Sequence, residues 1–168
     1  MKRLVILVAA ATIGSLAWAQ ASIDPVLDGK ITAGEYSVVQ VKDGFTVAAR
    51  LSSDGATLRV AVSAATEGWI AIGLGSKKMN GSFMIMGYVA DGKPNVSYEL
   101  GKGYSHAPVP APGANATVVE VGGVTTLEAV LPAKDYVKGG LLDTIAALGA
   151  RDDFRSKHSK RTAHELRL

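Results

Sequence analysis

The chain has 168 residues, a formal net charge of +3 at pH 7 and no cysteine. The absence of thiols excludes disulfides, Fe–S clusters, cysteine zinc sites and thiol catalysis, so stability must come from packing. A chain of this length can bury a hydrophobic core as one domain. The small net charge argues against a nucleic-acid partner.

The first 19 residues are typical of a secretory signal peptide. Lys2 and Arg3 precede an apolar run from Leu4 to Leu16, and Ala17-Trp18-Ala19 supplies a small-residue cleavage site before Gln20. The run is too short and wrongly flanked for a stable membrane span, and no later stretch approaches the roughly 18 apolar residues that a span needs. We therefore expect residues 20–168 to be one exported domain, periplasmic or secreted, with no transmembrane segment after cleavage.

Short β-rich runs separated by turn signals cover the rest of the chain. The runs are residues 45–52, 56–64, 68–75, 82–90, 94–100, 116–121, 124–131, 141–150 and 162–168. Asp-Gly pairs at 28–29, 43–44, 54–55 and 91–92, and a Gly-Gly pair at 122–123, are hairpin signals because both central turn positions favour positive φ. Nine short strands with this spacing predict an all-β fold, an antiparallel sandwich.

Two segments lack the β-strand pattern of these runs. Residues 132–140 have a proline at the start and Gly139 near the end, which predicts one helical turn within a crossover. Residues 107–116 are rich in proline, alanine and glycine and are expected to be a surface loop, because proline is excluded from central strands.

The run at residues 68–75 has two contrasting faces. Ile70, Ile72 and Leu74 share one face and form an ordinary core pattern, whereas Trp69, Ala71, Gly73 and Gly75 share the other. Glycine inside a strand indicates a bulge or the close approach of another group. That group could be a flat ligand or simply a neighbouring strand. Gly87 is a second such gap.

Met79 lies in the polar loop SKKMNG that follows this run. A loop methionine is most often a hydrophobic plug, and its alternative role is as a thioether ligand of haem iron, which pairs with histidine in cytochromes. The histidines are His106, His158 and His164, and no spacing among them suits zinc. The chain shows neither a nucleophile elbow nor a P-loop, so no enzyme activity is expected.

Several motifs together resemble the DOMON domain, the family named for the N-terminal domain of dopamine β-monooxygenase, which includes the haem domain of cellobiose dehydrogenase. They are DGKITAGEY (28–36), GWIAIGLG (68–75), MNG (79–81), MIMGYV (84–89) and HSKRTAHELRL (158–168). The resemblance spans nearly all of residues 20–168. It implies an immunoglobulin-like β-sandwich of about nine to eleven strands, which agrees with the strand pattern above.

The resemblance also implies a function. Haem-binding members hold b-type haem non-covalently through a methionine and a histidine, which correspond here to Met79 and to His158, with His164 as second choice. Lys157 or Lys160 could replace the histidine, as lysine does in related haem subunits. The expected pocket lining is Trp69, Ala71, Gly73, Met84 and Met86. The leading hypothesis is thus an exported electron-transfer cytochrome that carries single electrons to or from a separate redox partner protein.

The alternative hypothesis is a haem-free DOMON module that binds a carbohydrate or a partner protein. A sugar site needs exposed aromatic side chains for stacking. The candidates are Trp69, Tyr88, Tyr98 and Tyr104, and a chain that is only 6% aromatic offers few of them.

Overall fold

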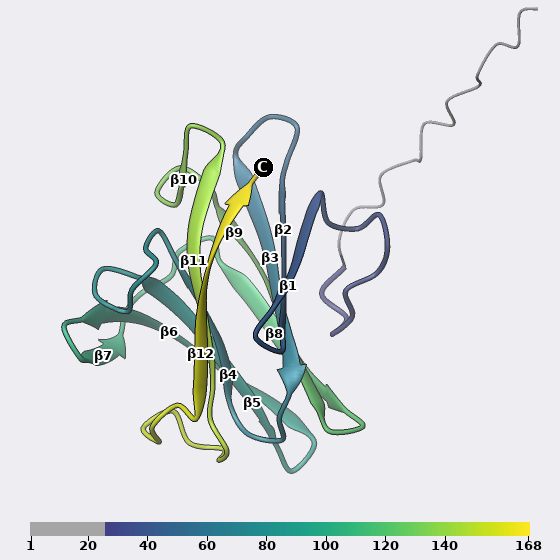
Figure 1. Cartoon of the computed structure of the whole chain (residues 1–168), viewed down its shortest axis with the longest axis vertical. Helices are drawn as coiled ribbons and strands as arrows, with labels where there is room; N and C mark the ends of the chain where they lie inside the picture. The colour runs from purple at the N-terminus through teal and green to yellow at the C-terminus, as the bar shows by residue number, and fades with distance from the viewer. Residues whose placement is uncertain (1–25) are drawn as a thin grey trace, which may run out of the picture.

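Residues 26–168, which the computed structural model describes, form 12 strands joined largely by tight turns (Figure 1). The expected signal peptide at 1–19 and the expected start at Gln20 lie outside the described residues. Within residues 26–168 there is no helix of the length and hydropathy that crossing a bilayer requires.

The strands make two antiparallel sheets. The first has the order β1-β2-β3-β9-β8 and consists of Val38–Lys42, Phe45–Leu51, Thr57–Ala65, Val124–Pro132 and Asn115–Val121. The second has the order β10-β11-β4-β5-β6-β7, and β12 pairs with the free side of β11. Its strands are Val137–Lys138, Leu141–Leu148, Ile70–Leu74, Phe83–Ala90, Lys93–Lys102, Ser105–Pro108 and Lys160–Arg167.

The tight turns confirm three of the hairpin signals. Asp43 and Gly44 have φ of 50° and 76° and join β1 to β2, and Asp91 and Gly92, at 51° and 70°, join β5 to β6. The Gly-Gly pair at 122–123, at 60° and 76°, joins β8 to β9. Each pair occupies the two central positions of a turn whose twist matches that of its flanking strands.

The predicted all-β antiparallel sandwich is confirmed, and each of the nine expected runs contains a strand. The strand number exceeds the expected nine to eleven because β1, β7 and β10 are short strands at sheet edges. Strand β7 lies partly in the expected surface loop and ends at Pro108, where an edge position tolerates the missing N–H.

The expected crossover at residues 132–140 is confirmed, because the chain passes from β9 of the first sheet to β10 of the second, and its helical turn is confined to residues 133–137 and ends before Gly139. The Ala133 carbonyl accepts hydrogen bonds from the amides of Tyr136 and Val137, at 3.0 and 3.1 Å, and the chain then enters β10. Gly139 and Gly140, with φ of 58° and 74°, turn it directly into β11. Two adjacent glycines with positive φ make a hairpin here, so no helix is propagated.

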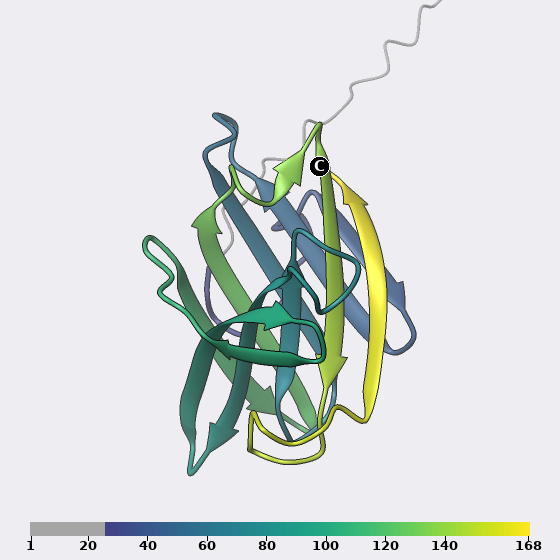
Figure 2. The same ribbon diagram turned by 90° about the vertical axis from the view of Figure 1, so that its left-hand side faces the viewer.

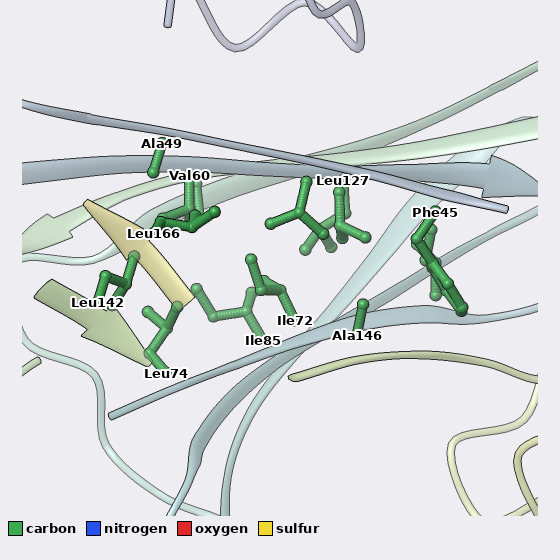
Figure 3. Packing of buried hydrophobic residues seen from close by; sticks show 14 of the residues in the cluster. Phe45, Ala49, Val60, Ile72, Leu74, Ile85, Leu127, Leu142, Ala146 and Leu166 are labelled. Atoms are coloured by element: carbon green, nitrogen blue, oxygen red, sulfur yellow. The ribbon is translucent and has the colours of Figure 1, made fainter. Parts of the chain in front are cut away.

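The main core fills the space between the two sheets (Figure 3). Phe45 and Val60 from the first sheet meet Ile72, Ile85 and Leu166 from the second, and all five are fully buried. Because side chains alternate along each strand, this packing uses one face of each sheet and leaves the other face available.

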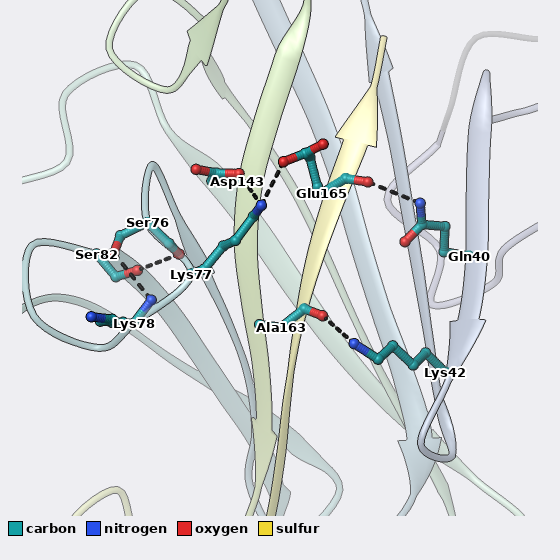
Figure 4. A network of polar contacts seen from close by, with 9 residues as sticks. All are labelled: Gln40, Lys42, Ser76, Lys77, Lys78, Ser82, Asp143, Ala163 and Glu165. Atoms are coloured by element: carbon teal, nitrogen blue, oxygen red, sulfur yellow. Dashed lines mark hydrogen bonds and ion pairs between the residues drawn. The ribbon is translucent and has the colours of Figure 1, made fainter.

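The two sheets meet laterally at a seam between β1 and β12, which we call the β1–β12 seam. Gln40 Nε2 donates to the Glu165 carbonyl and Lys42 Nζ to the Ala163 carbonyl, both at 2.9 Å (Figure 4). Side chains thus cap the edge of β12 in place of a strand ladder. His164 is buried at this seam, with Nδ1 3.3 Å from Gln40 Oε1 and Nε2 without a partner among the described residues.

A buried carboxylate ties the segment before β1 to the first sheet. Glu128 on β9 is fully buried and accepts hydrogen bonds from the backbone amides of Asp28 and Gly29, at 2.9 and 2.6 Å. Its other oxygen accepts a bond of 2.6 Å from the hydroxyl of Tyr36. These three donors compensate the desolvation of the carboxylate.

We predict that Tyr36→Phe lowers the free energy of unfolding by about 1 to 3 kcal/mol, because it leaves a buried carboxylate oxygen without its donor. Burial raises the pKa of Glu128, whereas the Tyr36 hydrogen bond lowers it by favouring the ionised form. The loss should therefore be largest at neutral pH and shrink in acid, as Glu128 becomes protonated.

Urea unfolding of wild type and Tyr36→Phe, measured at neutral pH and in acid, tests this prediction. Tyr104→Phe is the matched control because the Tyr104 side chain is fully exposed. Equal losses in the two variants would contradict the role given to the Tyr36 hydroxyl.

Candidate functional site

The second face of the seven-stranded sheet is also apolar. Trp69, directly before β4, Ala71 of β4, and Met84 and Met86 of β5 are buried there as a cluster separate from the main core. The sequence pattern correctly separated this face from that of Ile70, Ile72 and Leu74. An antiparallel sheet commonly exposes one face to water, so this second apolar face marks a candidate site.

Three chain segments cover this face and enclose a groove of about 1020 Å³. They are the loop between β4 and β5, the β6–β7 hairpin, and the loop between β11 and β12. Figure 2 looks onto this face: the hairpin lies across the front, and the β11–β12 loop is the yellow-green segment at the bottom. All five residues of the expected pocket lining line this groove: Trp69, Ala71, Gly73, Met84 and Met86.

Trp69 fastens the β11–β12 loop to the floor of the groove. Its indole Nε1 donates a hydrogen bond of 2.9 Å to the hydroxyl oxygen of Ser156 in that loop. Gly149 makes room for the indole, since a Cβ there would lie 2.1 Å from Trp69 Nε1. Two residues before Ser156, Phe154 packs on Tyr88 with ring centroids 4.7 Å apart. The loop therefore has a defined position over the sheet.

The β4–β5 loop, which carries Met79, is held against β6. The amide of Gly81 donates to the Gly101 carbonyl at 2.9 Å, and the amide of Ser82 donates to the Met79 carbonyl at 3.0 Å. A Cβ on Gly101 would lie 1.9 Å from the Met79 carbonyl oxygen and 3.1 Å from Met79 Cγ. The loop backbone thus crosses directly over Gly101, where only glycine fits, and Met79 lines the groove.

Cationic side chains surround the groove. Lys77 is held by Asp143 and Glu165 on the neighbouring strands (Figure 4), and the hydrogen bond to Glu165 raises the pKa of Lys77. Four more cations line the groove and are exposed: Lys78, Arg155, Lys157 and Arg161. No aspartate or glutamate is among the lining residues of the described chain. The rim therefore favours an anionic ligand or partner.

The glycine gaps have local causes that the sequence did not reveal. A Cβ on Gly73 would lie 2.7 Å from Ile145 Cγ1, so a neighbouring side chain already approaches this position. Gly75 has a φ of 81° and is required by its backbone conformation. Gly87 points into the main core, where a Cβ would lie 2.5 Å from Leu127 Cδ1.

The candidates for the second iron ligand, beside Met79, lie at different places in the structure. His158, half-buried in the β11–β12 loop, lines the groove together with Lys157. His164 faces the β1–β12 seam instead, and burial lowers its pKa, with Lys42 adding to the shift. Lys160 Nζ lies beside Gly44 at the β1–β2 turn. Met79, His158 and Lys157 thus share the groove, and His164 and Lys160 are absent from its lining.

Sequence reasoning gave no role to His106, which also lines the groove. It lies on β7, and its Nδ1 makes a close hydrogen-bonded contact with Glu99 Oε2. Glu99 is buried on β6, directly opposite Met84 of β5. The only sequence signal for this placement is the Gly103-Tyr104 pair, which makes the two-residue turn between β6 and β7.

The donors in the groove are soft or nitrogenous. Met79 offers a thioether, and His106 and His158 offer imidazoles, which together suit iron or copper more than a hard cation. Within residues 26–168 no three histidine, aspartate or glutamate side chains gather as a metal cluster. A metal held here would therefore need further ligands, such as those that a macrocycle supplies.

The family model of the DOMON domain matches residues 41–133, which include β2 to β9, the Met79 loop and His106. The chain therefore belongs to the DOMON domain family. No curated protein sequence matches the chain.

Two solved structures share the fold. One is the cytochrome domain of cellobiose dehydrogenase from Myriococcum thermophilum, with a TM-score of 0.58 and 18% identity over 78% of this chain and 81% of that one. The other is the cytochrome b domain of pyranose dehydrogenase from Coprinopsis cinerea, with a TM-score of 0.56 and 15% identity over 73% and 74%. A family 9 carbohydrate-binding module from Caldicellulosiruptor kristjanssonii, in complex with cellotriose, matches with a TM-score of 0.44 and 10% identity over 83% and 79%.

We predict that Gly101→Ala displaces the Met79 loop and lowers the free energy of unfolding by about 3 kcal/mol, the upper end for overpacking, because the new Cβ meets backbone atoms. Hydrogen exchange should show reduced protection at the amides of Gly81 and Ser82. The matched control is Gly92→Ala, which has open space around it but a φ of 70°, so its loss of about 1 to 2 kcal/mol comes from backbone strain alone. Unchanged protection at Gly81 and Ser82 in the Gly101 variant would refute the close crossing.

Proposed function

We propose that the chain is an exported electron-transfer protein that holds haem b non-covalently in the groove, with Met79 and His158 as axial ligands. The observation that carries this proposal is that Met79 and His158, which are far apart in the sequence, line the same groove from two different loops. The shared fold with two cytochrome domains supports it.

The groove fits a haem group in three respects. Its volume of about 1020 Å³ is at the large end for ligand pockets, as a macrocycle requires. Its floor is apolar and includes Trp69, Ala71 and Met86. Its cationic rim offers Lys78, Arg155 and Arg161 to the two carboxylates that haem carries.

The topology places the two proposed ligands on opposite sides of the groove. Met79 lies over β6, toward one edge of the seven-stranded sheet, and the loop with His158 arises from β11 and β12 at the other edge. Strands β4 and β5 form the floor between them. Ligands that approach from two sides are what a planar macrocycle with two axial bonds needs.

Bound haem would supply a one-electron couple at its iron. Met79 and His158 would fill both axial positions, which makes the protein a carrier and not an enzyme, because no position stays open for a substrate. The cationic rim would steer a separate, acidic redox partner protein toward the groove.

The visible spectrum of protein exported with haem available tests the proposal. We predict a Soret band with sharp reduced α and β bands, and a weak near-infrared band of the ferric thioether bond. A colourless, fully folded protein that takes up no added haemin would refute the proposal and favour the haem-free module.

The ligand assignment is tested with a pair of histidine variants. His158→Ala removes the stronger axial bond, so most haem should be lost, whereas His164→Ala should keep the low-spin spectrum because His164 faces the seam. Haem affinity of the wild type should also weaken in acid, since His158 must be neutral to bind iron. Haem loss in the His164 variant alone would reverse the assignment.

A haem-free module that binds carbohydrate is the second candidate function. The observation in its favour is Tyr104, which is fully exposed at the groove rim. The other aromatic candidates are less available: Trp69 is buried under its loop, Tyr88 packs against Phe154, and Tyr98 packs against Phe83 and the main core. One free tyrosine is a small stacking platform for a sugar ring.

A further inference from the structure

Met79 and His106 lie side by side on one wall of the groove. Gly101 of β6 pairs directly with His106 of β7, and directly paired residues point to the same face with Cβ positions about 5 Å apart. The position that a Cβ of Gly101 would take lies 3.1 Å from Met79 Cγ. The thioether of Met79 and the imidazole of His106 therefore project from neighbouring points of the same face.

The imidazole of His106 is oriented as metal-binding imidazoles are. Its Nδ1 contacts Glu99 Oε2, and the other oxygen of that buried carboxylate accepts a hydrogen bond of 2.8 Å from Ser97 Oγ. A carboxylate that accepts a hydrogen bond from Nδ1–H keeps the proton on that nitrogen, leaves the lone pair of Nε2 free and fixes the ring. His106 lines the groove, so Nε2 is the nitrogen that remains for a ligand there.

We propose that His106, oriented by Glu99, is a reserve ligand for haem iron on the Met79 side of the groove. This inference rests on the proposed function. His106 cannot be the partner of Met79 across the macrocycle, because the two side chains lie on the same wall. Nε2 would instead serve the iron from the same side as the thioether, when the thioether is absent.

The consequence for the proposed carrier is protection of the iron. A thioether is a weak ligand of ferric iron compared with an imidazole. A second donor on the same side would keep small molecules such as peroxide from the iron whenever Met79 did not hold it. His106 would thereby keep the site restricted to electron transfer.

The test compares haem-loaded variants by optical and electron paramagnetic resonance spectra and by reduction potential. Met79→Leu conserves volume and should fold, since such swaps disturb packing little. We expect this variant to remain low-spin with two imidazole ligands, without the near-infrared thioether band and with a lower potential than the wild type. Met79→Leu combined with His106→Gln should be high-spin, because the glutamine can still donate to Glu99 but cannot replace the imidazole.

Two further variants complete the test. His106→Gln alone should keep the wild-type low-spin spectrum with its thioether band, and Glu99→Gln in the Met79→Leu background should reduce the low-spin fraction. A high-spin Met79→Leu variant of a low-spin wild type would overturn the reserve-ligand inference and leave the proposed function intact. Loss of the thioether band in His106→Gln would overturn it as well. A wild type that takes up no haemin would overturn both proposals.

Discussion

The burial of β4 on both of its faces is the constraint on which the rest of the structure depends. All five residues of β4 are buried, although an antiparallel sheet usually presents one face to water. One face of the strand packs in the main core, and the other faces the groove. Because the second face is apolar, it must be covered. The described chain has only two sheets, so other segments must provide this cover.

Loops provide this cover, and each is held by a specific contact. The indole of Trp69 bonds the β11–β12 loop through Ser156, and the close crossing at Gly101 positions the β4–β5 loop. Loops pack less closely on the sheet than a further sheet would, so a space remains between the loops and the floor of the groove. The same contacts that protect the apolar face therefore also define the groove and decide which side chains reach it.

The sequence predicted the elements that depend on local signals. Asp-Gly and Gly-Gly turns set the hairpins, and the alternation in residues 69–75 separated the core face from the groove face. The short strand β1 lacks a distinctive pattern, and β7 was hidden within a segment rich in proline. Such edge strands form because a neighbouring strand offers a hydrogen-bonding edge, which is a tertiary effect.

The candidate site was predictable only in part, for the same reason. Met79, His158 and the five floor residues were singled out from motifs, and the structure brings them to one groove. His106 was passed over because its importance comes from two pairings, with Gly101 across the hairpin and with Glu99 diagonally. Nothing in the local sequence around His106 indicates either partner. Likewise, the direction in which His164 points depends on the β11–β12 register.

The β1–β12 seam has a consequence for how the molecule moves and assembles. The carbonyls of Ala163 and Glu165 are occupied by the side chains of Lys42 and Gln40, so an incoming strand from another molecule finds this edge already engaged. Side-chain bonds can also break one at a time, unlike a cooperative ladder. Single contacts at the seam can thus open while the strand ladders and the core between the sheets stay intact.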